Sequence, residues 1–271
     1  MKKIVRSNLY FVLIILLEFL IPILFRGVYA SIADIRIRLF LSHFMCFIVP
    51  AVIFIIVTKS NPKTLLRLNK ISLKQFGMLV LIAFLSQPIM MSCSVISAVF
   101  FKNNVSEFMG QIQSTSFIVM LLLMAVMPAI SEEITIRGIV LSGYDKVSDF
   151  KAALITGIFF GIFHLDLQQF LYAAVLGVIL GYVVRINNSI LSSMTIHFLI
   201  NGTSVVIQTI TQHLYGNIQN SSSESASLVN LSINEKIGVI VTYLGIAIAF
   251  GGVIYFLLKK LKEISNAKNV L

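Results

Sequence analysis

Long runs of apolar residues with few charges dominate the sequence. Eight can be recognised, most of them close to the roughly 20 apolar residues that a helix needs to cross a bilayer: 9–25, 39–58, 76–101, 117–141, 152–164, 170–184, 190–210 and 237–258. Charged residues make up 12% of the chain, against about 25% in soluble globular domains. The pattern predicts an all-α fold, a polytopic bundle of about eight transmembrane helices.

Two of these runs, 152–164 and 170–184, are short for full crossings. We expect them to be joined by a tight link at 166–169 and to pack inside the protein. Gly177 and Gly181 are four residues apart on the second of them. Such small-xxx-small spacing allows close approach to a neighbouring helix.

The distribution of basic residues predicts the orientation. The net charge is +10, but the positive residues lie in short segments between apolar runs, which indicates membrane topology and argues against nucleic-acid binding. Basic residues gather at the N-terminus, after the second run and at the C-terminus, and eight spans put these three segments on one side. We therefore expect a multi-pass protein of the cell membrane with both termini cytoplasmic. The Ser- and Asn-rich segment 212–236 is expected outside, although Arg26, Arg36 and Arg38 in the first outer loop run against this orientation.

Three ionisable residues interrupt the fourth apolar run. Segment 117–130 carries no charge, and Glu132, Glu133 and Arg137 follow it. Ionisable residues inside a membrane span are costly and mark a functional site by default. Glu133 and Arg137 are four residues apart, so in a helix they share a face and can pair. Glu132 is turned about 100° away from Glu133 and faces a different neighbour.

Further polar residues lie in later apolar runs. His164 stands four residues after Phe160, and Asn201 four residues after His197, so each pair shares a helical face. At 1.5 Å per residue, Glu132, His164 and His197 lie about 10–20 Å from the cytoplasmic ends of their spans. Their similar depth predicts one polar cavity inside the membrane, opening toward the cytoplasmic side. His43 and His213 are interpreted as hydrogen-bonded interior groups.

Together these residues form three ordered motifs. They are Glu132-Glu133-x-x-x-Arg137, Phe160-x-x-x-His164 and His197-x-x-x-Asn201. In this order, each on a predicted span, they resemble the CAAX protease and bacteriocin-processing family (CPBP, or Abi) of intramembrane proteases. The resemblance covers about residues 126–202. One departure is Thr135-Ile136, where family members often carry an aromatic residue; it is expected to alter packing beside the site without removing a reacting group.

The resemblance implies a hydrolytic mechanism without a Ser or Cys nucleophile. Glu132 and His164 would activate a water molecule for attack on a peptide carbonyl, and His197 and Asn201 would stabilise the oxyanion. A carboxylate in a low-dielectric setting suits general-base catalysis, and donors aimed at developing charge in a water-poor cavity are a large catalytic term. The supporting residues would be Glu133, Arg137 and Phe160.

A zinc-dependent version of the same enzyme is the main alternative. Two His and one Glu can hold catalytic zinc with an open position, and Glu132, His164 and His197 supply these types. The HExxH signature of soluble zinc proteases is absent. Asn201 suits an oxyanion role and is a poor zinc ligand, so we favour a mechanism without a cofactor.

Two non-enzymatic interpretations stay open as well. The polar cluster could hold the helices of a non-catalytic immunity or scaffold protein together. A transporter with a midplane site is disfavoured because the sequence shows no internal repeat. Substituting Glu132 discriminates between enzyme and scaffold, because only the enzyme loses function with its fold intact.

The predicted organisation has three parts: N-terminal helices in 1–110, a catalytic core in 111–211, and an outer loop with the last helix and a basic tail in 212–271. The expected partners are the lipid bilayer and a peptide or membrane-protein substrate. The sequence does not name that substrate. The substrates that we favour are leader-bearing peptides, such as bacteriocins or pheromones, or membrane proteins.

Overall fold

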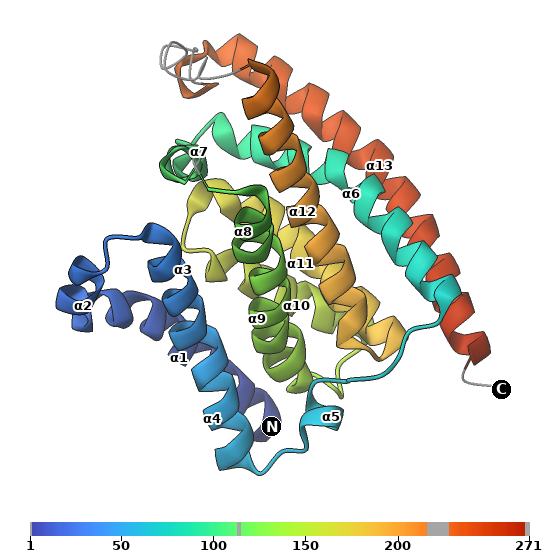
Figure 1. Ribbon diagram of the computed structural model, residues 1–271. Helices are drawn as coiled ribbons and strands as arrows, with labels where there is room; N and C mark the ends of the chain where they lie inside the picture. Colours follow the sequence, from blue (N-terminus) through green and yellow to red (C-terminus); the bar gives the residue numbers. More distant parts are fainter. Residues whose placement is uncertain (1, 113–114, 216–227, 269–271) are drawn as a thin grey trace.

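The computed structural model describes residues 2–112, 115–215 and 228–268, and within them the secondary structure is helical, with no strand (Figure 1). Seven helical segments of this part are long and apolar enough to cross a membrane: Lys2–Leu24, Ile35–Thr58, Leu73–Ala98, Phe117–Val140, Leu167–Asn187, Ile190–Leu214 and Ile233–Ala267. The prediction of an all-α, polytopic membrane protein is therefore confirmed. Of the eight predicted spans, the one at 152–164 is missing from these seven.

The helices follow one another along the chain. They are α1 (Lys2–Leu24), α2 (Arg26–Ser31), α3 (Ile35–His43), η1 (Phe44–Ile48), α4 (Val49–Thr58), α5 (Pro62–Leu65), α6 (Leu73–Ala98), α7 (Asn104–Gln111), α8 (Phe117–Leu121), η2 (Leu122–Val126), α9 (Met127–Glu133), η3 (Ile134–Val140), α10 (Asp149–Phe163), α11 (Leu167–Asn187), α12 (Ile190–Tyr215), η5 (Leu228–Asn230) and α13 (Ile233–Lys268).

Two of the crossings are composite helices with π-helical turns. One runs α3–η1–α4 and the other α8–η2–α9–η3. Pro50 and Pro128 lie at the starts of α4 and α9, directly after the π-helical turns η1 and η2. Proline has no N–H to continue the i→i−4 ladder and its ring crowds the preceding turn, which accounts for wider turns at these places. A π-helical turn inside an α-helix is frequent at functional sites.

The short predicted span became one arm of a hairpin. Helix α10 has 15 residues, and it runs antiparallel to α11. Asp166 caps the start of α11 by accepting from the backbone N–H groups of Gln168 and Gln169. The arms touch at glycine: a Cβ added at Gly177 would lie 2.7 Å from the Cα of Gly157. The close helix approach predicted from the Gly177–Gly181 spacing is confirmed.

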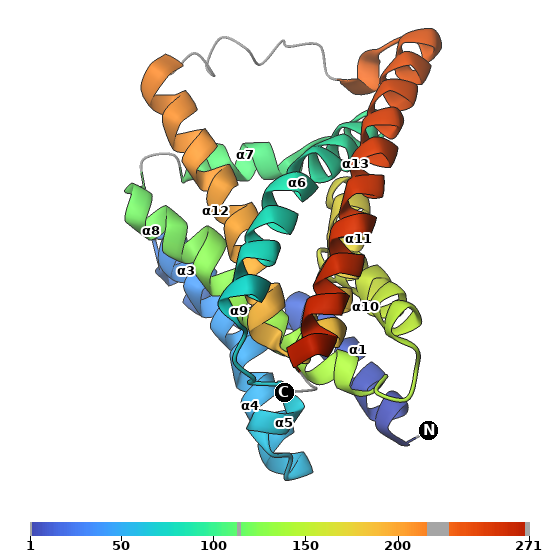
Figure 2. The same ribbon diagram turned by 90° about the vertical axis from the view of Figure 1, so that its right-hand side faces the viewer.

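Both ends of the chain lie at the same end of the bundle (Figures 1 and 2). This terminus end also carries α5 and the turn between α11 and α12, and there the Gln75 side-chain N–H donates to Ser265 Oγ at 3.0 Å. Helices α2 and α7 lie at the opposite end. The predicted outer loop 212–236 starts at that end, and its residues 216–227 lie outside the described residues.

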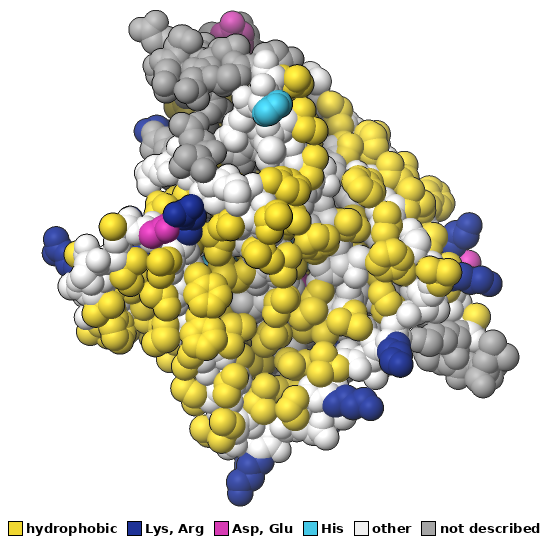
Figure 3. Space-filling model, viewed as in Figure 1, with side chains coloured by type: hydrophobic (Ala, Val, Ile, Leu, Met, Phe, Trp, Pro, Cys, Tyr) yellow, Lys and Arg dark blue, Asp and Glu magenta, His cyan; other side chains and the backbone are white. Residues whose placement is uncertain are grey.

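The surface is apolar over the helical flanks. Figure 3 shows hydrophobic side chains covering most of one face, with basic side chains near its edges. The interior is filled mainly by α9, η3, α10 and α11, with Ile136, Ile139 and Leu180 fully buried. Large apolar side chains such as Leu9 and Ile56 are more than 60% exposed. Such a surface suits a bilayer, because lipid chains cover it.

Candidate active site

The first motif lies where α9 passes into η3, and its arginine ties three segments together. Arg137 Nη1 lies 3.0 Å from Glu133 Oε1, and both side chains are fully buried. The guanidinium carbon stands 4.1 Å from the ring centroid of Phe160 on α10. Arg137 Nη2 also donates to the carbonyl oxygen of Gly177 on α11 at 3.4 Å. The predicted Glu133–Arg137 pair is therefore present. Through Arg137 it links the helix α9–η3, called the motif helix below, to the α10–α11 hairpin.

Glu133 has a second partner that the sequence did not reveal. His197 Nδ1 lies 2.9 Å from Glu133 Oε1. Because a carboxylate only accepts, Nδ1 is the donor, and the neutral ring then carries no proton on Nε2. That Nε2 lies 3.9 Å from Glu132 Oε2. Glu133 thus holds His197 in orientation, in addition to pairing with Arg137.

His164 in the second motif and Asn201 in the third each donate a hydrogen bond to a backbone carbonyl oxygen. His164 follows the last residue of α10, and its Nδ1 donates to the carbonyl oxygen of Phe160 at 2.8 Å. The His164 ring meets the Phe160 ring edge-on at 4.8 Å between centroids. Asn201 on α12 donates from Nδ2 to the carbonyl oxygen of Met124 in η2 at 3.1 Å. One N–H of the Asn201 amide is therefore used and one is left.

All four predicted catalytic side chains line one cavity of about 550 Å³: Glu132, His164, His197 and Asn201. The structure brings them together from two crossings, α8–η2–α9–η3 and α12, and from the α10–α11 hairpin. Glu132 is 8% exposed, and its Oε2 is buried without a hydrogen-bond partner among the described residues. A buried carboxylate oxygen without a hydrogen bond is costly. The Glu132 residue as a whole lines a cavity that is large enough for water.

Other polar groups share this cavity, and sequence reasoning did not assign them to it. Gln87, Gln168 and Tyr172 contribute to its wall, and so does His43. His43 Nδ1 lies 3.2 Å from the hydroxyl of Ser131, the residue before Glu132. His43 is the hydrogen-bonded interior group that we expected, but it also faces the site. No signal in its own sequence neighbourhood could have shown this, because it depends on α3 packing against α9.

The direction in which the cavity extends differs from our expectation. Along α12 its lining runs from His197 through Ser204 to Gln208, away from the terminus end. Asn103 and Met109, at the opposite end of the bundle, line it too. The cavity therefore extends toward the opposite end and not, as we predicted, toward the side of the termini.

A segment after α5 packs against the motif helix at the terminus end. Leu66 covers Gly138, where an added Cβ would come within van der Waals overlap of the Leu66 side chain. Arg67 Nη1 donates to the carbonyl oxygen of Arg137 at 3.3 Å. Burial lowers the pKa of the Arg67 guanidinium, and the nearby Asp145 carboxylate opposes this. The depth of a residue, counted along its own helix, does not reveal that a distant segment of the chain packs against that helix.

The donor types for zinc lie on the wall of this cavity, in Glu132, His164 and His197. No group of three His, Cys, Asp or Glu side chains in the described part of the chain is already gathered with the spacing of a metal site. In both His164 and His197 the Nδ1 atom is hydrogen-bonded and Nε2 is left, as in His residues that bind a metal. The mechanism without a metal stays a prediction.

Comparison with known proteins gives one match. Residues 114–203 match the family model described as Rce1-like, type II CAAX prenyl endopeptidase. The resemblance to the CAAX protease and bacteriocin-processing family is thereby confirmed, and the matched segment contains all three motifs. It lies wholly inside the predicted core 111–211, whose boundaries stay predictions. No curated protein and no solved structure matches the chain.

Proposed function

We propose that this protein, whose residues 114–203 match a CAAX-type endopeptidase family, is an intramembrane endopeptidase that hydrolyses a peptide bond with water activated by Glu132 and His164. The family supports a peptidase acting on a peptide substrate in a bilayer. One observation carries the finer proposal: Glu132 lines the same cavity as His164, while Arg137 binds the neighbouring Glu133. A scaffold has no need for a carboxylate at a cavity wall.

The geometry suggests how the reaction proceeds. A water molecule would bind between the Glu132 carboxylate and His164 Nε2, the free acceptor of that ring. Glu132 accepts a proton as the water oxygen attacks the peptide carbonyl, and the C=O electron pair moves onto oxygen. When the tetrahedral intermediate collapses, the C–N bond breaks and Glu132 returns the proton to the leaving amine.

The developing oxyanion needs donors, and α12 supplies two. Asn201 has one amide N–H besides the one that it gives to Met124. His197 Nε2 donates only from the doubly protonated ring, for which Glu133 at Nδ1 is the counter-ion. Donors held in place before the charge develops are typically worth about 10²–10³ in rate each. Glu133 is thus a positioning residue in this mechanism.

The substrate would be a membrane-associated or leader-bearing peptide. Basic side chains gather at the terminus end, which favours a cytoplasmic location for both termini in the cell membrane. The cavity then extends toward the outer half of the bilayer, and we propose that the scissile segment reaches Glu132 from that half. Gln87, Gln168 and Gln208 line this route and suit an extended peptide backbone, because amides both donate and accept.

The test compares membrane peptides from cells that carry wild-type protein, Glu132→Gln or Glu263→Gln. Glu263 is exposed on α13, so its substitution controls for the change from carboxylate to amide. We expect cleavage products with the wild type and Glu263→Gln, and none with Glu132→Gln at equal membrane abundance. Products that persist with Glu132→Gln would refute the proposed base. Loss of activity on dialysis against a chelator, restored by zinc, would favour the metal-dependent alternative.

A further inference from the structure

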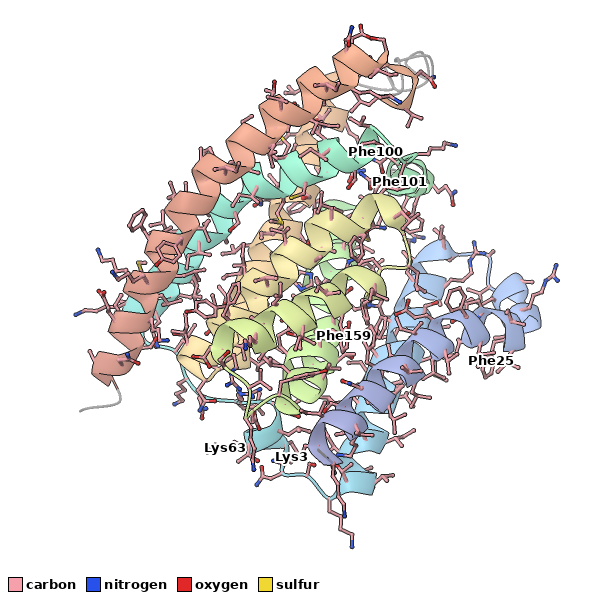
Figure 4. The ribbon with its side chains drawn as sticks, turned by 180° about the vertical axis from the view of Figure 1, so that it is seen from behind. Lys3, Phe25, Lys63, Phe100, Phe101 and Phe159 are labelled. Atoms are coloured by element: carbon pink, nitrogen blue, oxygen red, sulfur yellow. The ribbon has the colours of Figure 1, made fainter. Side chains whose placement is uncertain are left out.

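A second cavity, separate from the catalytic one, lies at the terminus end. It has a volume of about 620 Å³ and shares no lining residue with the catalytic cavity. Four basic side chains from three distant segments form its wall: Lys3 and Arg6 on α1, Arg67 after α5, and Arg185 near the end of α11. Figure 4 labels both Lys3 and Lys63 at this end of the molecule.

The carboxylates in this pocket are committed to two of the arginines. Asp145 pairs with Arg67 Nη2, and Arg185 Nη1 lies 3.5 Å from the same carboxylate. Arg185 Nε donates to Asp149 Oδ1 at 3.0 Å. Both aspartates thereby hold the pocket wall in shape and are less available to other cations.

Lys3 and Arg6 supply the excess positive charge. Among the described residues neither side chain makes an ion pair, and both residues are exposed. Arg6 is placed by Phe54 of α4, whose ring centroid lies 5.4 Å from the guanidinium carbon. The pocket thus offers a net positive, preformed concavity with donors from several directions.

The surroundings of the pocket distinguish between possible anions. Directly along α1 and α4 from it lie exposed apolar side chains, among them Leu9, Val12, Ile53 and Ile56. A free phosphate makes no use of such a surface, whereas a lipid places its acyl chains there and its headgroup at the helix ends. Basic pockets between transmembrane helices bind anionic headgroups in this way. We propose that this pocket binds the phosphate headgroup of an anionic phospholipid.

The pocket is joined to the motif helix. Arg67, in its wall, donates to the backbone oxygen of Arg137, and the adjacent Leu66 packs over Gly138. An anion held near Arg67 therefore supports the segment that packs against the motif helix. The lipid is expected to stabilise the fold around the motif helix, whether or not the protein is a peptidase.

The experiment uses full-length protein in nanodiscs of phosphatidylcholine with or without phosphatidylglycerol. Lipid retention is read by native mass spectrometry after release from the disc. We expect the wild type to retain phosphatidylglycerol in preference to phosphatidylcholine. Lys3→Gln with Arg6→Gln should weaken this retention about thirtyfold, because each basic side chain near a membrane surface contributes about 1 kcal/mol.

The matched control is Lys259→Gln with Lys260→Gln, which removes the same charge from an exposed part of α13 at the terminus end. It should retain the lipid like the wild type. Equal loss in both double variants would reduce the effect to general surface charge and overturn the proposal. Displacement of the lipid by inorganic phosphate at equal concentration would overturn it as well. If the Lys3→Gln, Arg6→Gln variant does not fold, Lys3→Gln alone is measured, and it should weaken lipid retention several-fold.

Discussion

Glu132 and Glu133 are neighbours in the chain but have different surroundings. Glu133 is fully buried and accepts from Arg137 and His197 at 3.0 and 2.9 Å. Glu132 lines the cavity, and its Oε2 lies 3.9 Å from His197 Nε2. The turn of about 100° between consecutive helical residues produces this difference. One carboxylate is therefore suited to structure and positioning, and the other to reaction with a bound water.

The residue scale also shows what spacing can predict. The Glu133–Arg137 pair follows from an i,i+4 relation within one helix, and so it could be predicted from the sequence. The Glu133–His197 bond joins residues 64 positions apart and depends on α12 packing against α9. The cavity residues were recognised as polar groups at similar depth in apolar runs, and motif resemblance supplied their roles. Helical periodicity alone does not place the three helices α9, α10 and α12 around one space.

Exchanging Glu133 should give a different result from exchanging Glu132. Glu133→Gln leaves Arg137 buried without a counter-ion, which typically costs about 3–5 kcal/mol. We expect a clear fall in thermal unfolding temperature for Glu133→Gln and a near wild-type value for Glu132→Gln. Proteolysis should be lost in Glu132→Gln, while Glu133→Gln keeps residual activity below its unfolding temperature.

A double variant separates the stability cost of an unpaired buried charge from the loss of activity. Glu133→Gln combined with Arg137→Met removes both members of the buried pair, and it should recover much of the lost stability. Activity should stay low in this variant, because His197 still lacks its anionic partner. If Glu133→Gln unfolds like the wild type, the pair has no structural role. If Glu132→Gln keeps activity while Glu133→Gln loses it, the two roles are reversed.

Among the elements, the α10–α11 hairpin determines where His164 lies. The apolar run 152–164 is short for a full crossing, which indicated that this segment packs inside the protein. The spacing of Gly177 and Gly181 indicated close approach to a neighbouring helix. The π-helical turns were not predictable from apolar content, because a run of Leu, Met and Val is equally compatible with an uninterrupted α-helix. Helix α13 is also longer than predicted, since it continues as a polar helix beyond 237–258 to Lys268.

Gly177→Ala tests the hairpin contact. The added Cβ would lie 2.7 Å from Gly157 Cα and 3.0 Å from the Gly157 carbonyl oxygen, so the backbone has to move. Overpacking of this kind costs typically 1–3 kcal/mol, and it disturbs the Gly177 carbonyl that accepts from Arg137. We expect a lower unfolding temperature, measured by circular dichroism in detergent.

The matched control for this substitution is Gly238→Ala on α13. An added Cβ there meets no atom within 4 Å, and Ala favours a helix over Gly by about 1 kcal/mol. Its unfolding temperature should therefore be unchanged or slightly higher. Equal effects at both positions would show that helix propensity, and not the close approach of α10 and α11, determines the stability change at Gly177.

In the whole molecule, the basic side chains gather at the terminus end, whereas the catalytic cavity extends toward the opposite end. Counting basic residues in the sequence predicts both termini on one side of the membrane, and both ends of the chain lie at the same end of the bundle. The hairpin preserves this parity, since α10 and α11 together return the chain to the terminus end. The cavity extends away from that end along α12, a direction that depends on how the helices pack and that depth counted along one helix does not give.

Thiol labelling of intact cells tests this arrangement. In a background in which the buried Cys46 and Cys93 are replaced by Ala, one cysteine is introduced at Lys146, exposed at the terminus end, or at Asn103, exposed at the opposite end. Because basic loops stay in the cytoplasm, a membrane-impermeant maleimide should label Asn103→Cys in intact cells and Lys146→Cys only after permeabilisation. A third cysteine, at Gln208 in the cavity wall, should react from outside, and its labelling should block proteolysis. Labelling of Lys146→Cys in intact cells would show that the terminus end lies outside the cell. The cavity would then extend toward the cytoplasm.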